Sequence, residues 1–102
     1  MSKIGIRAVR HNGYALRYVK DQTEKICIEA VKEEGLVLEF VKDQTKEICL
    51  EAVKEDGYAL EYVKNQTEEI CLMATRLHAY AIEYIEDSEM QQRIEQILGL
   101  KT

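Results

Sequence analysis

Three cysteines, two histidines and several adjacent glutamates are the side chains of this sequence that could do chemistry. Cys27, Cys49 and Cys71 recur at one constant interval, and thiolates act as zinc ligands or as redox pairs. If the interval reflects stacked helical units, equivalent positions lie about 8–10 Å apart. Zinc–sulfur bonds are about 2.3 Å, and Cα atoms joined by a disulfide lie within about 7 Å. We therefore expect three reduced thiols that pack as small hydrophobic residues, with no metal and no disulfide.

The two histidines and the paired carboxylates give no sign of acid–base catalysis. No serine or cysteine has a sequence context that would identify it as the nucleophilic partner of His11 or His78, and both histidines are expected in solvated turns. Glu33–Glu34 and Glu68–Glu69 are adjacent at helix ends that are expected to face water, so we assign them no acid–base role. The sequence thus predicts a protein without catalytic residues, metal or cofactor, which is not an enzyme.

Aromatic residues form two columns with the same spacing. The first contains Tyr14, Leu36, Tyr58 and Tyr80, and the second contains Tyr18, Phe40, Tyr62 and Tyr84. In the second column Phe40 replaces tyrosine, so the hydroxyl group is dispensable at this position. The second column is therefore predicted to consist of packing residues. Leu36 supports the same inference for the first column, although half-exposed rings there would instead form a recognition surface. Packing between units is the favoured interpretation.

The elements that must position these residues are helices. The chain has 102 residues, 46% of them hydrophobic and 32% charged, which fits one folded domain. It contains no proline, so glycine is the main helix breaker. No apolar run approaches the roughly 20 residues that cross a membrane. The charged N-terminus does not resemble a signal peptide, and a cytoplasmic location is expected.

A 22-residue repeat organises the whole sequence. The segments 23–44 and 45–66 are identical at 14 of 22 positions. Isoleucine, alanine and glycine columns run through the chain, as in Ile26, Ile48 and Ile70. The predicted units are 1–22, 23–44, 45–66 and 67–88, followed by a C-terminal cap at 89–102, all within a single domain covering 1–102.

Each unit is predicted to contain two short helices separated by its glycine. Ile48, Cys49, Ala52 and Val53 share one face of the first helix. Gly57 is expected to end it in the left-handed conformation. A second helix over 58–65 is expected to bury Ala59, Leu60 and Val63. The strings Asp-Gln-Thr-Glu and Asn-Gln-Thr-Glu, at 21–24 and 65–68, resemble capping boxes.

Helices of about ten residues are marginal alone in water, so each unit must pack on the next. This requirement predicts an all-α fold, an αα-solenoid of about four helix-turn-helix repeats. Residues 89–98, with Met90, Ile94, Ile97 and Leu98 on one side and Gly99 after them, are predicted to form a C-terminal capping helix.

The string from Ala52 to Leu72, AVKEDGYALEYVKNQTEEICL, closely resembles the repeat called domain of unknown function 4116. The resemblance covers roughly residues 4–86. It rests on Gln-Thr-x-x-Ile-Cys-Leu and Val-Lys-x-x-Gly-x-Ala-Leu, which occur together at fixed spacing. It implies a tandem helical array of the kind found in bacteria, their mobile elements and large DNA viruses. It implies no activity and no functional residues.

Charge divides the chain into a basic start and an acidic remainder. Residues 1–22 carry a net charge of +4, and the three following units carry −3, −2 and −4, within a total of −5. One interpretation pairs Arg7 with Glu29, and Arg17 with Glu39, across neighbouring units. Such exposed pairs are worth under about 1 kcal/mol each. The opposite end charges also permit self-association.

Two functions fit these features. The first is a protein-interaction scaffold with an unidentified protein partner. The second is an anti-CRISPR-like viral or mobile-element inhibitor, whose acidic surface blocks a basic nucleic-acid channel of a host nuclease. Direct nucleic-acid binding is expected only at a basic patch of Lys3, Arg7, Arg10, Arg17 and Lys20. The residues predicted to bind a partner are Arg7, Arg10, Tyr14, Arg17, Tyr58, Glu61, Tyr80 and Glu83.

Overall fold

The computed structural model describes residues 2–100, with side chains from Gly5 onward. Residues 1, 101 and 102 lie outside this description. The side chains of Ile4, which starts the isoleucine column, and of Lys3, which belongs to the predicted basic patch, also lie outside it.

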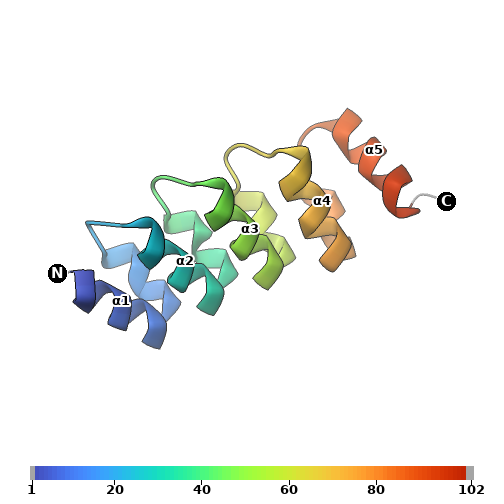
Figure 1. Ribbon diagram of the computed structural model, residues 1–102. Coiled ribbons are helices and arrows are strands. Elements are labelled where there is room, and N and C mark those ends of the chain that lie inside the picture. The colour runs from blue at the N-terminus through green and yellow to red at the C-terminus, as the bar shows by residue number, and fades with distance from the viewer. Residues whose placement is uncertain (1, 101–102) are drawn as a thin grey trace.

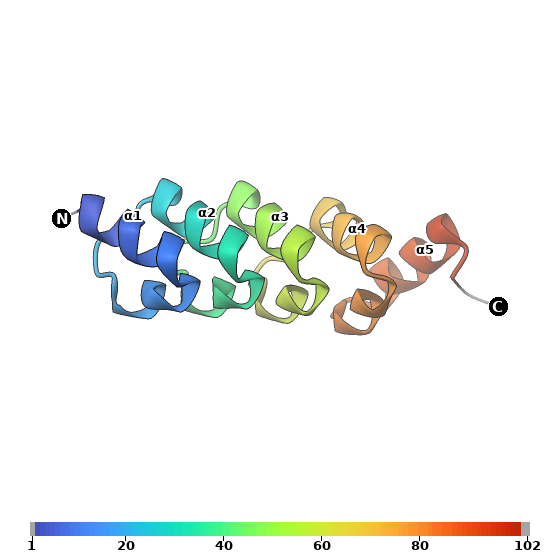
Figure 2. The ribbon, with the colours of Figure 1, turned by 90° about the horizontal axis from the view of Figure 1, so that it is seen from below.

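The described chain is a two-row helical solenoid. The first row contains α-helices α1 (Ser2–His11), α2 (Glu24–Glu33), α3 (Lys46–Glu55), α4 (Glu68–Leu77) and α5 (Ser88–Leu98). The second row contains the short 3-10 helices η1 (Gly13–Tyr18), η2 (Gly35–Phe40), η3 (Gly57–Tyr62) and η4 (Ala79–Tyr84). The two rows lie side by side along a long axis of 50 Å (Figures 1 and 2). The predicted all-α repeat fold is confirmed.

The second helix of each unit is a 3-10 helix and is shorter than predicted. In the third unit it covers Gly57–Tyr62, and the amide of Val63 closes it by donating to the carbonyl oxygen of Leu60 at 3.1 Å. This helix reaches the loop within two turns of the glycine, and 3-10 geometry is common in such short segments. The predicted burial of Ala59, Leu60 and Val63 is confirmed.

Threonine caps the three internal α-helices. The hydroxyl oxygens of Thr23, Thr45 and Thr67 each accept a hydrogen bond from the backbone amide three residues later, at 3.2 Å. The predicted capping boxes therefore start two residues too early, because Asp21 and Asn65 do not occupy the N-cap position. The cap recurs at the same position of each internal unit, so these units all start their α-helix at the same point.

The glycine columns have a different cause from the one predicted. Within residues 2–100, only Gly99 has a positive φ, of 67°. A β-carbon on Gly35 would lie 2.6 Å from the Ala52 carbonyl oxygen, and one on Gly13 would lie 2.8 Å from that of Ala30. These glycines therefore allow a close approach between one unit and the next. The equivalent residue of the last unit, Ala79, is exposed and carries a β-carbon.

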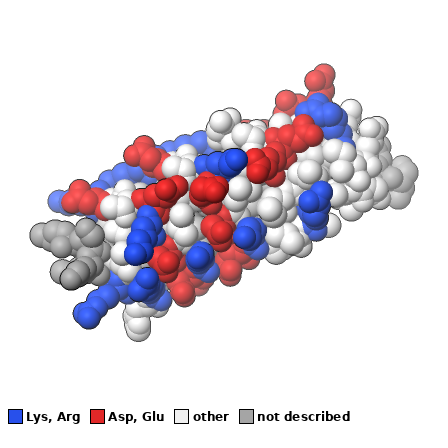
Figure 3. Space-filling view, in the orientation of Figure 1, with Lys and Arg blue, Asp and Glu red and all other residues white. Residues whose placement is uncertain are grey.

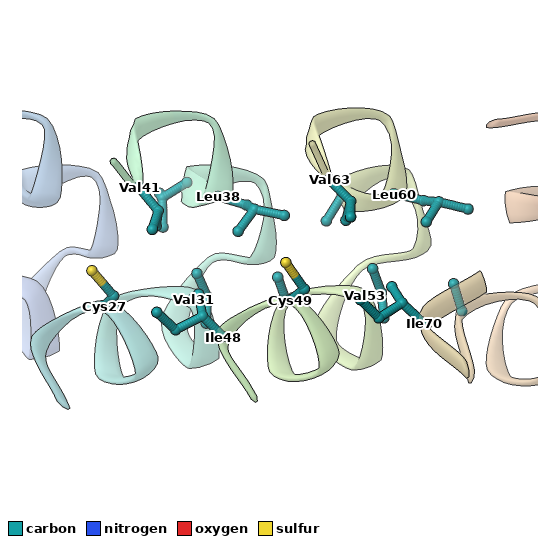
Figure 4. Packing of buried hydrophobic residues seen from close by; sticks show 14 of the residues in the cluster. Cys27, Val31, Leu38, Val41, Ile48, Cys49, Val53, Leu60, Val63 and Ile70 are labelled. Carbon is teal, nitrogen blue, oxygen red and sulfur yellow. The ribbon is translucent and has the colours of Figure 1, made fainter. Parts of the chain in front are cut away.

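The core is a continuous apolar layer between the two rows. Figure 4 shows Val31 beside Ile48, and Val53 beside Ile70, so each α-helix packs on the following one. Leu38 and Leu60, from the row of 3-10 helices, cover this layer and are fully buried. Removing such side chains from water contributes about 1.5–3 kcal/mol each. No helix in the described part of the chain is long and apolar enough to cross a membrane.

A glutamine side chain links each of the first three units to the next. Gln44 Nε2 donates to the carbonyl oxygen of Tyr62 at 2.8 Å, and its Oε1 accepts from the amide of Lys64 at 3.0 Å. Gln22 and Gln66 make the same pair of bonds one unit earlier and one unit later. The bonded groups belong to the turn where the next 3-10 helix ends. Each glutamine therefore satisfies backbone groups that the short helix leaves unpaired.

The C-terminal helix closes the array with a different packing angle. In Figure 2, α5 is inclined to the parallel helices α1–α4. Ile94 is fully buried, while Met90 and Leu98 pack against the core, as predicted. Ile97 was expected to join them but is 54% exposed, so this part of the prediction is wrong. Gly99 follows the helix in the predicted left-handed conformation.

Replacing Gln44 with leucine should destabilise the array. The variant removes both partners of the third unit's turn, and the Tyr62 carbonyl is partly buried, so we expect a loss of about 1–3 kcal/mol in the free energy of unfolding. This loss is measured by urea unfolding, with circular dichroism as the signal. Gln92→Leu, at an exposed position of α5, is the control and should change stability little. Equal stability of both variants would refute the role of the glutamine bonds.

Candidate functional site

The three cysteines are buried packing residues and not a reactive site. They are at most 4% exposed, and all are free thiols. Burial, followed by the charges of Asp43 and Glu24, raises the pKa of Cys27 to about 11. Burial also raises the pKa of Cys49 and that of Cys71, the latter to about 11. The thiols are therefore protonated at neutral pH.

Each protonated thiol also joins the glutamine network. The Sγ atoms of Cys27 and Cys49 lie 3.6 and 3.5 Å from Oε1 of the glutamine five residues earlier, and both point toward the row of 3-10 helices in Figure 4. Cys71 makes the same contact with Gln66 at 3.8 Å. Among the residues with described side chains, no three His, Cys, Asp or Glu residues could hold a metal ion together.

The two histidines have different surroundings. His11 is exposed at the end of α1, as expected. His78 is partly buried: its Nε2 lies 3.0 Å from the Lys54 carbonyl oxygen, and its ring centroid lies 5.7 Å from that of Tyr80. The prediction of a freely solvated His78 is therefore wrong. The His78 side chain contacts the preceding unit, where Gly57 leaves room for it because it has no β-carbon.

The α-helical row carries a mixture of both charges. Figure 3 shows acidic and basic side chains interspersed on the face that the α-helices present, with acidic groups across its middle. Three ion pairs join neighbouring helices of this row: Arg10–Glu29 at 3.2 Å, Lys46–Glu69 at 3.3 Å and Arg93–Glu68 at 3.1 Å. All involve partly exposed side chains, so each contributes at most about 1 kcal/mol.

The predicted pairs of Arg7 with Glu29 and of Arg17 with Glu39 are not present among the described side chains. Arg10, one helical turn beyond Arg7, takes Glu29 instead. The Arg17 guanidinium carbon lies 5.3 Å from the ring centroids of Tyr18 and Phe40. Arg17 thus makes cation–π contacts and does not pair with a carboxylate.

Exposed aromatic rings gather on the row of 3-10 helices. We call this surface the 3-10 face and define it by twelve residues of η1–η4, each exposed or half-exposed: Tyr14, Arg17, Tyr18, Leu36, Glu39, Phe40, Tyr58, Glu61, Tyr62, Tyr80, Glu83 and Tyr84. Tyr14, Tyr58 and Tyr80 are 39%, 47% and 41% exposed. The first aromatic column is therefore half-exposed, which is the alternative that would serve recognition.

These rings also pack between units in a repeated geometry. Tyr14 meets Phe40 at a centroid distance of 6.4 Å, and Tyr58 meets Tyr84 at 5.5 Å, with an interplanar angle of 71° in both pairs. Tyr58 and Tyr80 lie closer, at 4.5 Å. Such contacts are worth about 0.5–1.5 kcal/mol beyond burial. The rings thus support the array and remain accessible at the same time.

The second aromatic column is a packing column except at its start. Phe40, Tyr62 and Tyr84 pack against the core, as predicted. Tyr18 is 78% exposed, so the prediction fails there. A ring from the preceding unit covers both Phe40 and Tyr84. Among the described residues, no aromatic ring of another unit covers Tyr18 in this way.

Glutamates border the rings of the later units. Glu39, Glu61 and Glu83 are exposed and occupy the position that Arg17 holds in the first unit. The charge of Glu39 is the largest cause that raises the pKa of Tyr62, followed by burial and Glu61. Burial raises the pKa of Tyr84, with Tyr58, Glu61 and Glu83 adding to it. Each of these two rings therefore lies in the field of the preceding unit's glutamate.

The structure brings together six of the eight residues predicted to bind a partner. Tyr14, Arg17, Tyr58, Glu61, Tyr80 and Glu83 all belong to the 3-10 helices. Arg7 and Arg10 lie on α1, in the other row. The prediction omitted Glu39, Tyr62 and Tyr84. Glu39 could have been found from the sequence, because Glu39, Glu61 and Glu83 recur at one position in each of the last three units.

Comparison with protein families agrees with the repeated geometry. Residues 23–67 and 45–91 both match the family described as Domain of unknown function (DUF4116). The two matches overlap and start one unit apart, at the threonine caps Thr23 and Thr45. This chain belongs to the DUF4116 family. Neither a curated protein nor a solved structure matches it.

Within the DUF4116 matches lie Glu39, Glu61, Tyr62 and the Tyr58–Tyr84 contact, so most of the 3-10 face belongs to the family's repeat. Arg17 and Tyr18 precede both matched segments. The basic start of the chain is thus outside the segments that carry the family pattern. The acidic and aromatic residues of the 3-10 face therefore lie mainly in the matched segments, and the basic residues of the first unit do not.

Replacing Glu39 with glutamine should lower the pKa of Tyr62. The carboxylate disfavours the phenolate, so removing its charge makes deprotonation easier. A titration followed by NMR of labelled tyrosine rings measures the change. Glu47→Gln removes an exposed carboxylate of α3 and serves as the control. If both variants titrate like the wild type at Tyr62, the two side chains are not neighbours in solution.

Proposed function

We propose that this DUF4116 chain is a non-enzymatic protein-interaction scaffold that binds a partner protein through its 3-10 face. The observation that carries the proposal is the set of half-exposed tyrosines repeated along this face. Tyrosine is enriched among the residues that dominate binding at protein interfaces, because it offers a large rigid contact area and one polar atom.

The solenoid architecture supports the same proposal. Each unit contributes the same few surface positions, so neighbouring units extend one binding surface without a new fold. The α-helical row, by contrast, carries a mixture of both charges, and three ion pairs join its own helices. The 3-10 face is therefore the surface with aromatic groups left for a partner.

The chemistry of the remaining residues supports a scaffold without turnover. The cysteines are buried and protonated, and their sulfurs contact glutamines of the fold. His78 contacts a backbone carbonyl and a tyrosine ring. Three unpaired thiols fit the reducing conditions of the cytoplasm, which we propose as the compartment. A turnover that survived repurification and disappeared with one substitution would contradict the proposal.

Site-specific crosslinking tests the proposed face. A photoreactive phenylalanine analogue placed at Tyr58 should crosslink one defined partner in cells that naturally make the protein, because this ring is 47% exposed at the centre of the face. The same analogue at Gln92, an exposed position of α5, should give no such product. Adding Tyr80→Ala should weaken the crosslink several-fold. Equal products from positions 58 and 92 would refute the assignment of the face.

The acidic residues favour a second candidate. Glu39, Glu61 and Glu83 place one exposed carboxylate on the 3-10 face in each of the last three units, and the net charge of the chain is −5. A row of carboxylates can mimic nucleic-acid phosphates. The partner would then be a nuclease of the host, and the chain would be an anti-CRISPR-like inhibitor, viral or mobile-element encoded, that occupies the basic channel.

This second candidate predicts competition with nucleic acid. Once crosslinking identifies a nuclease, the chain should displace DNA or RNA from it, and raising the salt concentration should weaken binding steeply because exposed charges are screened over about 8–10 Å. Fluorescence anisotropy of labelled nucleic acid measures both effects. Simultaneous binding of the chain and nucleic acid, or an affinity unaffected by salt, would contradict the inhibitor and leave the scaffold.

A further inference from the structure

Arg17 shows what the 3-10 face can bind. Its guanidinium carbon lies 5.3 Å from the centroid of Phe40, the ring of the following unit's second aromatic column. Tyr14 meets the same ring edge-on at 71°. A cation above an aromatic face at this distance is attracted by the ring's negative charge density, and arginine is the commonest such cation. The first unit therefore places its own Arg17 guanidinium over the ring of Phe40.

The next two units have the same ring without the arginine. Glu39 and Glu61 replace Arg17, and the rings that follow them are Tyr62 and Tyr84. The edge-on neighbour of Tyr84 is Tyr58, at the same angle of 71° as in the first unit. By the 22-residue repeat, Glu39 and Tyr62, and likewise Glu61 and Tyr84, occupy the positions of Arg17 and Phe40, the pair in which the guanidinium carbon lies 5.3 Å from the ring centroid. A ring and a nearby carboxylate together attract a guanidinium more strongly than either does alone.

We propose that Tyr62 with Glu39, and Tyr84 with Glu61, are two binding sites for arginine side chains of a partner protein. We call them the ring–carboxylate sites. The guanidinium stacks on the tyrosine ring and pairs with the glutamate of the preceding unit, in the place where Arg17 lies on Phe40. This inference rests on the proposed scaffold function and specifies the chemistry of its partner. The occupant is an arginine-bearing extended segment.

The spacing of the sites indicates the conformation of that segment. The two sites lie one unit apart, and packed helices of neighbouring units are usually about 8–10 Å apart. A polyproline II segment rises about 3.1 Å per residue with three residues per turn, so arginines three residues apart lie on one side and about 9 Å apart. They match two successive ring–carboxylate sites.

Arginine is favoured over lysine at these sites by shape. The planar guanidinium can stack on a ring and offer hydrogen bonds to a carboxylate at its edge, whereas an ammonium group is compact and more strongly hydrated. A cation–π contact at an exposed site is worth about 0.5–1 kcal/mol, which corresponds to roughly two- to fivefold in affinity. Discrimination between the two cations therefore tests stacking separately from simple charge attraction.

The direct test compares short peptides on the full chain. The probe is the peptide Pro-Arg-Pro-Pro-Arg-Pro, with both ends blocked, and its binding is measured by NMR titration of the amide signals at fixed salt. We expect it to bind roughly two- to fivefold more tightly per site than the lysine version, and more tightly than the isomer Pro-Arg-Arg-Pro-Pro-Pro. Equal affinity for the arginine and lysine peptides, or for both isomers, would overturn the proposal.

A gain of binding provides a second test. Arg17→Glu exposes Phe40 and places a carboxylate where the later units have theirs, so it should create a third ring–carboxylate site. A peptide extended to three arginines at the same spacing should then bind the variant roughly two- to fivefold more tightly than it binds the wild type. Lys25→Glu is the matched control, because it changes the net charge equally at an exposed position of α2, where later units carry Glu47 and Glu69.

The control separates the sites from net charge. If Lys25→Glu raises the affinity as much as Arg17→Glu does, the peptide responds only to charge and the proposal fails. Glu39→Gln with Glu61→Gln, both at exposed positions, should reduce binding without affecting the fold. If crosslinking at Tyr58 captures a partner while no peptide distinguishes arginine from lysine, the scaffold function stands and the arginine sites do not.

Discussion

The structure depends on contact between successive units, because no unit contains enough buried surface or enough paired backbone groups to fold by itself. Gln22, Gln44 and Gln66 meet this need by bonding the amide and carbonyl groups at the end of the next 3-10 helix. Gly13 and Gly35 allow the backbones to approach within a distance that a β-carbon would block. The buried thiols complete the same network. Repetition of these contacts fixes the spacing of every surface residue.

This constraint also separates the two surfaces of the molecule. The α-helices are long enough to place charged side chains beside those of the neighbouring helix, and ion pairs form there. The 3-10 helices are much shorter, so most of their outward positions lie at the boundary between units. Aromatic rings at that boundary pack against the next unit and still meet solvent. A surface of this kind is suited to binding, because its groups are held rigidly before a partner arrives.

At the two ends of the described array, equivalent residues differ in burial and in their contacts with neighbouring units. Tyr18 and Phe40 share a column, yet Tyr18 is exposed, whereas Phe40 packs against the core and is covered by Tyr14. Ala79 replaces glycine where the close approach between units ends. Thr75 occupies a column of valines, and its buried hydroxyl has no hydrogen-bond partner in the described structure. It lies on α4, the last of the four α-helices that belong to the repeat.

The sequence by itself determined the period, the all-helical class, the buried columns and the place of the C-terminal helix, because each depends on local pattern or on repetition. Tertiary structure decided the rest. The glycines serve close packing and not a left-handed turn, the second helices are 3-10 helices, and Arg10 rather than Arg7 pairs with Glu29. These outcomes depend on distances between units. A column in a sequence says which residues are equivalent, but only the packing of one unit on the next determines which atoms meet.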